Sequence, residues 1–256
     1  MAFTFYERNL VNTTSQIFLS SGSGTASNLY DRKEQFKWAS SGESGSGTTA
    51  TISIVFGSST SIGDIFLTNH NFKGFNIIYN SNTANQFTPG LSVTANTNSN
   101  TAYSIGTTSV NSIDINVWTT QTDSAEKYLG QLIISKGKQV ELDTNPTANN
   151  YRPVQRHIGL FREMIDGGAI NLRNSTKFMA DVTLDLINTQ TFVDLFTVWK
   201  NNRPFLFAEF PDTFTASWNG IAKDVMWAGD FTCRQFRQNK KSGGYRGNFT
   251  LRQIPD

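Results

Sequence analysis

Alternating apolar and polar positions dominate the first half of the chain. In TATISIVFG (49–57) every second residue from Ala50 to Ile54 is apolar and the residues between are Thr or Ser. This period of two is that of a half-buried β-strand, and SIDINVWTT (112–120) repeats it. Further expected strands are QIFLS (16–20), FKWAS (36–40), DIFLTN (64–69), FNIIYN (75–80), LSVTAN (91–96) and YLGQLIIS (128–135). Short strands separated by Gly, Ser, Thr and Asn tracts predict a β-sandwich or jelly roll.

The pattern breaks at DTNPTANNYRP (143–153), which is polar, contains two prolines and has no apolar periodicity. Such stretches are typical of domain boundaries. We therefore expect two domains, residues 1–145 and 146–256.

The second half predicts strands with one helix among them. FREMIDGGAINLRN (161–174) is expected to form a hairpin because Asp-Gly-Gly can adopt positive φ at its tip. KFMADVTLDLIN (177–188) and FLFAEF (205–210) are expected strands. A last hairpin is expected from DVMWAGDFTCRQFRQN (224–239) and YRGNFTLRQI (245–254).

The segment NTQTFVDLFTVWKNNRPFLF (188–207) predicts a short amphipathic helix. Asn188 or Thr189 can cap its start, and Asn201, Asn202 and Pro204 favour its end. One apolar stripe at i, i+3, i+4 and i+7 is expected to form the helix core against a sheet: Phe192, Leu195, Phe196 and Trp199. The fold class expected is mainly β, a jelly-roll sandwich followed by a second sandwich with one packed α-helix.

Composition and charge exclude several classes of protein. The formal net charge is +2, which is too small to argue for nucleic acid or membrane binding. Residues 1–150 hold 8 Lys/Arg against 10 Asp/Glu, and residues 151–256 hold 14 against 10. The single cysteine, Cys233, excludes an intramolecular disulfide framework. No apolar stretch reaches the length of a membrane span.

No catalytic or cofactor constellation is evident, so we expect neither an enzyme nor a cofactor or metal site. The two histidines, His70 and His157, are not in a metal-ligand spacing and are interpreted as structural. The two Gly-Ser-Gly runs lack the lysine of a phosphate-binding loop, and no G-x-S-x-G nucleophile motif occurs. Cys233 falls on the face of Trp227 and Phe231 and is interpreted as a core thiol. An enzyme stays the third hypothesis.

One cluster of basic residues in the last hairpin is a candidate interface: Arg234, Arg237, Lys240, Lys241, Arg246 and Arg252. It could contact nucleic acid phosphates, pair with acidic residues of a neighbouring subunit, or protect a sheet edge from aggregation. We favour the subunit contact because no aromatic residues are interleaved for base stacking.

The first half resembles the galactose-binding-like jelly roll of discoidin and coagulation-factor C-type domains over roughly residues 15–135. The residues that carry the resemblance are Asp31, Trp38 with Ala39 and Ser40, Gly57, Ile62 through Asn69, and Tyr79. In this family Tyr30 and Trp38 would be packing residues, and glycans would be bound by loops at one end of the barrel.

From about Gln155 onward the chain resembles the tail-tube and distal-tail fold of tailed phages, through the run TFVDLFTVWKNNRPFLF and the order hairpin, helix, strands. The domain order departs from that family, because here the jelly roll comes first. The resemblance implies a virion structural protein of a tail tip or baseplate, assembled in the host cytoplasm as a hexameric ring that contacts tube and hub proteins. The alternative is a carbohydrate-binding adhesion module that recognises a host glycan.

Overall fold

A computed structural model covers residues 1–256. It describes residues 3–7, 9–13, 16–20, 22, 25–31, 36–40, 48–86, 92–142, 146–147, 149–163, 169–209, 222–238 and 242–254.

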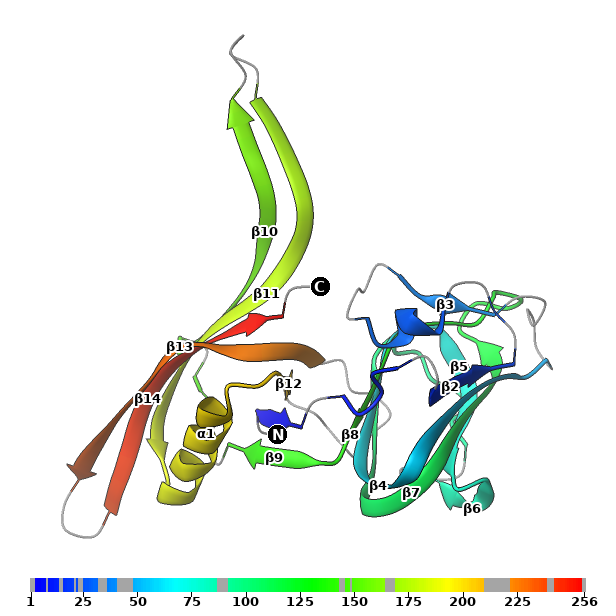
Figure 1. The fold of residues 1–256 in the computed structure, drawn as a ribbon, viewed down its shortest axis with the longest axis horizontal. Helices are drawn as coiled ribbons and strands as arrows, with labels where there is room; N and C mark the ends of the chain where they lie inside the picture. The colour runs from blue at the N-terminus through cyan, green and yellow to red at the C-terminus, as the bar shows by residue number, and fades with distance from the viewer. Residues whose placement is uncertain are drawn as a thin grey trace.

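The described residues form two antiparallel seven-stranded sheets and one α-helix, so the mainly β prediction is confirmed. The strands are β1 (Thr4–Tyr6), β2 (Ile17–Leu19), β3 (Trp38–Ala39), β4 (Ala50–His70), β5 (Phe72–Tyr79), β6 (Asn82–Gln86), β7 (Thr101–Thr120), β8 (Tyr128–Ser135), β9 (Lys138–Glu141), β10 (Tyr151–Glu163), β11 (Ala169–Ile187), β12 (Phe205–Ala208), β13 (Ala222–Gln238) and β14 (Ser242–Gln253). A 3₁₀ turn, η2 (Ala26–Leu29), and the helix α1 (Thr189–Asn201) complete the set. Figure 1 shows two units side by side, with β10 and β11 projecting away from both.

The first unit is the sheet β3-β8-β4-β7-β5-β6, with β2 paired to β4. The segments 49–57 and 64–69 prove to be one continuous strand, β4. Its pairing register with β7 shifts twice between Val55 and Asp64. Ile52 and Ile65 both reach the same core although their positions differ in parity. The bulges supply that change of face, because an extra residue reverses which side of a strand points inward. Both halves of β4 therefore face the same core.

β7 is longer than its sequence pattern predicts, because only residues 112–120 alternate clearly. The earlier half contains Gly106, which adopts φ +56, and a run of Thr and Ser. Pairing with the second half of β4 holds it in the sheet. The expected strand at 91–96 is reduced to one bridge between Phe75 and Val93, and its first residue lies outside the described residues.

The second unit is the sheet β10-β11-β14-β13-β12-β1-β9 together with α1. Tyr151 and Pro153 belong to β10, so the polar break around 143–153 ends in a strand rather than a loop. β10 is the first strand of this sheet, and an edge strand tolerates proline because its outward N–H groups need no partner. β1 and β9 also pair into this sheet. The division at residue 145 stays a prediction.

The helix follows its sequence signals closely. Asn188 caps the start, because its Oδ1 accepts from the backbone N–H of Thr191 at 2.8 Å. Asn202 ends the helix in the left-handed conformation at φ 45, and its N–H donates to the Trp199 carbonyl. α1 covers the concave side of the second sheet, beside β9 and β14 (Figure 1).

A small apolar cluster joins the two units. Tyr6 and Leu206 come from the second sheet, and Phe66 and Ile133 come from the first. The rings of Tyr6 and Phe66 meet edge to face with centroids 5.1 Å apart. Burial of these side chains stabilises a defined contact between the units.

Candidate functional site

The described members of the basic cluster lie on the face of the second sheet that points away from α1. Arg234 and Arg246 are cross-strand partners, and Arg252 is paired with Met226. Arg246 Nε donates to Asp185 Oδ1 at 2.6 Å, with both side chains largely exposed. The side chain of Arg237, and Lys240 and Lys241, lie outside the described residues.

This outer sheet face carries acidic groups as well. The Thr250 hydroxyl donates to Asp181 at 2.6 Å, and a shallow depression of about 400 Å³ lies there between β11, β13 and β14. Since Asp185 neutralises Arg246, the face has mixed charge. Mixed charge suits contact with another protein surface better than contact with a row of phosphates.

The helix stripe divides between the core and the edge of the sheet. Leu195 is 1% exposed. Phe192 stacks on Tyr245 with centroids 4.1 Å apart, and Trp199 Nε1 donates to the Gly229 carbonyl at 3.2 Å. Phe196 differs from the expectation, because it is 39% exposed.

Thr191 and Val198 are the other buried residues of the helix. The helix is therefore rotated so that Leu195 is central to the contact. Phe196 is left at the margin, where its ring meets Phe231 with centroids 5.4 Å apart. Sequence periodicity indicates an apolar stripe, but packing against the sheet decides which part of the stripe is covered.

The most unusual feature of the second unit is a two-stranded arm, which we define as residues 155–163 of β10 and 169–178 of β11. β11 pairs with β14 only from Met179 to Ile187. Beyond Met179 it pairs with β10 alone, from Gln155 opposite Phe178 to Glu163 opposite Ala169. The arm extends away from the body of the protein (Figure 1). The hairpin expected at 161–174 is its outer end, and the tip lies outside the described residues.

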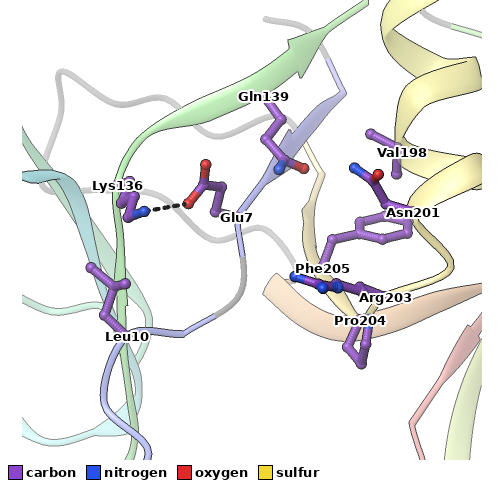
Figure 2. A pocket seen from close by; sticks show the side chains of 9 residues that line it. All are labelled: Glu7, Leu10, Lys136, Gln139, Val198, Asn201, Arg203, Pro204 and Phe205. Carbon is purple, nitrogen blue, oxygen red and sulfur yellow. Dashed lines mark ion pairs between the residues drawn. The ribbon is translucent and has the colours of Figure 1, made fainter.

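A pocket of about 500 Å³ lies at the junction of the two units. Figure 2 shows Arg203, from the turn after α1, and Phe205, the first residue of β12, lining the pocket across from Glu7 and Lys136. Lys136 and Glu7 form an ion pair at 3.5 Å. Its lining is completed by Leu10, Gln139, Val198, Asn201 and Pro204. The pocket is open and polar, and its shape depends on how the two units pack.

Several ionisable groups are buried near this junction or in the cores. Burial raises the pKa of Asp64 to about 6, against the lowering effects of the Ser104 hydroxyl and of Lys138. The pKa of Tyr6 is raised by burial and by the nearby Asp64 carboxylate.

His70 is buried and hydrogen-bonded within the first unit. Its Nδ1 accepts from the N–H of Phe72 at 3.1 Å, its Nε2 lies 3.0 Å from the Thr101 hydroxyl, and burial lowers its pKa to about 3. The side chain of His157 is not among those described. Across the described residues, no three His, Cys, Asp or Glu side chains are grouped so that they could hold a metal ion. No helix in the described part of the chain is long and apolar enough to cross a membrane.

Cys233 packs at the margin of the second core, and burial raises the pKa of its thiol. A raised pKa keeps the thiol protonated and unreactive.

Comparison with known proteins gives structural likeness without a family assignment. No family model and no curated protein matches the chain. A chitosan-binding module 1 from a chitosanase/glucanase of Paenibacillus sp. IK-5 (a V110M mutant) aligns at 16% identity and TM-score 0.42, covering 51% of this chain and 99% of that one. The family 32 carbohydrate-binding module of AlyQ aligns at 20% identity and TM-score 0.37, covering 51% of this chain and 96% of that one. The family 32 module of C. perfringens NanJ, in complex with galactose, aligns at 13% identity and TM-score 0.37, covering 52% of this chain and 98% of that one.

These TM-scores are below 0.5, so nothing about this chain follows from what those proteins bind.

Proposed function

We propose that this protein is a structural, non-enzymatic virion protein of a phage tail tip or baseplate. In this proposal, six copies associate into a ring around the tail channel and contact tube and hub proteins. Assembly takes place in the host cytoplasm, and the product is part of the tail. The observation that carries the proposal is the two-stranded arm.

The arm needs a partner for physical reasons. Nine residues of β10, Gln155 to Glu163, extend beyond the sheet, a reach of about 30 Å at about 3.4 Å per residue. An isolated two-stranded ribbon is only marginally stable in water. It also presents unpaired N–H and C=O groups along both edges. A neighbouring subunit that adds strands to these edges removes both costs.

The sheet also provides the second half of such a contact. Its two edge strands are β10 and β9, and the described β10 residues 152–156 are exposed. A contact between two different edges is heterologous, and heterologous contacts close into rings when the rotation allows. The mixed-charge outer face of β11, β13 and β14 gives a further surface for neighbours.

The experiment is to measure the mass of the full-length protein in solution by mass photometry, beside a variant with a shortened arm. Arg156 and Lys177 are cross-strand partners, so replacing residues 157–176 by Asn-Gly closes a two-residue hairpin. We expect rings for the wild type and monomers for the shortened protein. Circular dichroism and thermal melting check that the shortened variant is folded.

Arg234→Glu is the control that separates the two candidate surfaces. It adds a negative charge to the exposed outer face and leaves the arm intact. Rings that survive Arg234→Glu but not arm shortening assign the contact to the arm. A wild-type protein that stays monomeric at high concentration and is absent from purified tail particles would overturn the proposal.

A second candidate function is carbohydrate binding by the first unit, for adhesion to a host glycan. The observation that favours it is Phe18, which is 58% exposed on a sheet whose inner face forms a complete core. An exposed aromatic ring beside polar groups can stack on a sugar. Screening the full-length protein on a glycan array tests this function, and no binding to any glycan would count against it.

A further inference from the structure

The first unit has an aromatic and polar surface on the outer face of β2, β4, β7 and β5. Pairing places Phe18 opposite Ser53, and Ser53 opposite Asp114. Asn116 is paired with Thr51 on one side and Asn76 on the other. All of these alternate with buried core positions, so they point away from the core. We call this surface the outer ladder: Phe18, Thr51, Ser53, Asn76, Asp114, Asn116 and Trp118.

Hydrogen bonds fix the polar side chains of the outer ladder in place. The Thr51 hydroxyl donates to Asn116 Oδ1 at 2.9 Å, and Asn116 Nδ2 donates to Asn76 Oδ1 at 3.0 Å. The Ser53 hydroxyl donates to Asp114 Oδ1 at 2.6 Å. These side chains are half-buried, so they are held but still reachable.

The same bonds leave defined groups for a ligand. Among the described residues, Asp114 Oδ2 has no donor and the Asn76 amide N–H₂ has no acceptor. A carboxylate oxygen accepts from hydroxyls and an amide N–H₂ donates to them. Two adjacent hydroxyls of a sugar ring need both kinds of partner.

Aromatic rings lie at two ends of the outer ladder. Phe18 flanks Ser53 on β2, and Trp118 lies further along β7 over Gly74. A Cβ at Gly74 would be only 2.4 Å from Trp118 Nε1, so glycine is what lets the indole lie close to the sheet. Trp118 is half-buried and is not part of the core cluster. A half-buried indole in this position offers ring surface for the C–H face of a sugar.

The dimensions of the outer ladder fit a chain of sugars better than a single monosaccharide. Asp114 and Trp118 are four residues apart on one strand, about 13 Å at about 3.3 Å per residue. Phe18 lies two strands from Asp114, about 10 Å away at about 4.8 Å per strand. A surface of this extent contacts several sugar rings of one polymer at once.

Charge indicates which polymer. Asp114 is the charged residue of the outer ladder, and its carboxylate would repel the carboxylates of acidic sugars. We propose that the outer ladder binds a neutral hexose polysaccharide, with the rings of Phe18 and Trp118 stacking on sugar faces and Asp114 accepting from adjacent hydroxyls. This inference rests on the second candidate function and names its site.

The test uses the full-length protein and isothermal titration with neutral hexose oligosaccharides of glucose, galactose and mannose. Trp118→Ala is expected to weaken binding about tenfold, the loss of about 1.4 kcal/mol. Asp114→Asn keeps the shape but removes the charge, and is expected to weaken binding by a similar factor. Thermal melting verifies that each variant is folded.

Phe36→Ala is the matched control for Phe18→Ala. Phe36 is 47% exposed beside β3, an end strand that pairs with β8 and is not part of the outer ladder. We expect Phe18→Ala to weaken binding and Phe36→Ala to leave it unchanged. Binding by the wild type that Trp118→Ala, Phe18→Ala and Asp114→Asn all leave unchanged would overturn the outer-ladder site while keeping carbohydrate binding. A wild type that binds only acidic glycans or only a protein would also overturn it, and one that binds no glycan would remove the second candidate function itself.

Discussion

Asp64 is expected to make the stability of this protein depend on pH in the direction opposite to that of most carboxylates. Its side chain is only 4% exposed, in β4 near the junction of the two units. Burial raises its pKa from the ordinary 3.8 to about 6. Folding therefore favours the protonated form. The stability that protonation contributes is complete below about pH 3.8 and is lost as the pH rises through about 6.

The size of the effect follows from these two pKa values. The difference between 3.8 and about 6 corresponds to about 3 kcal/mol in full. Between pH 8 and pH 5 the linkage relation gives about 1.4 kcal/mol of added stability from this one group.

Urea unfolding of the wild type and Asp64→Asn at pH 8 and pH 5 measures it. Asparagine stays neutral at both pH values, so we expect the variant to be more stable than the wild type at pH 8. That advantage should shrink by about 1.4 kcal/mol at pH 5. Glu209, whose pKa burial raises to about 7, is present in both proteins and cancels in the comparison. Asp123→Asn, at an exposed position, is the control. Parallel pH profiles for the wild type and Asp64→Asn would refute the reasoning.

Three further predictions concern packing and capping. Gly247→Ala places a Cβ 2.3 Å from Cys233 Sγ and should lower the free energy of unfolding by about 1–3 kcal/mol. The loss should be much smaller in a Cys233→Ala background, where the next neighbour is 3.4 Å away. Additive losses of the two substitutions in urea unfolding would contradict this contact. Gly63→Ala meets the Lys136 carbonyl oxygen at 2.7 Å, a backbone atom that cannot rotate away, and should lower the melting temperature more than Gly247→Ala does. Asn188→Ala removes the helix cap and should cost about 1 kcal/mol, whereas Asn188→Ser should cost little; equal losses for both would exclude a capping role.

Local rules allowed the sequence to predict what depends on neighbours along the chain. The start and end of α1 follow from Asn188 and Asn202, because capping involves residues a few positions apart. The inward and outward positions of β14 follow from alternation, with Phe249 and Leu251 buried and Arg252 exposed.

Partners distant in sequence were decided only by the tertiary structure. The first residues of the chain, at Phe5, pair with Phe207, about two hundred positions away, and nothing in the alternation indicates this. Backbone hydrogen bonds are the same for every residue type, so a strand pattern shows which side faces the core but not which strand lies beside it.

The candidate sites also depend on pairing between strands that are distant in the sequence. Phe18 and Trp118 are a hundred residues apart, and only the pairing of β2, β4 and β7 places them on one face. The arm likewise depends on where β14 stops pairing with β11, near Met179. Alternation and capping thus determined the elements and their inward faces. Strand pairing, whose backbone hydrogen bonds do not depend on residue type, decided the surfaces from which function is proposed.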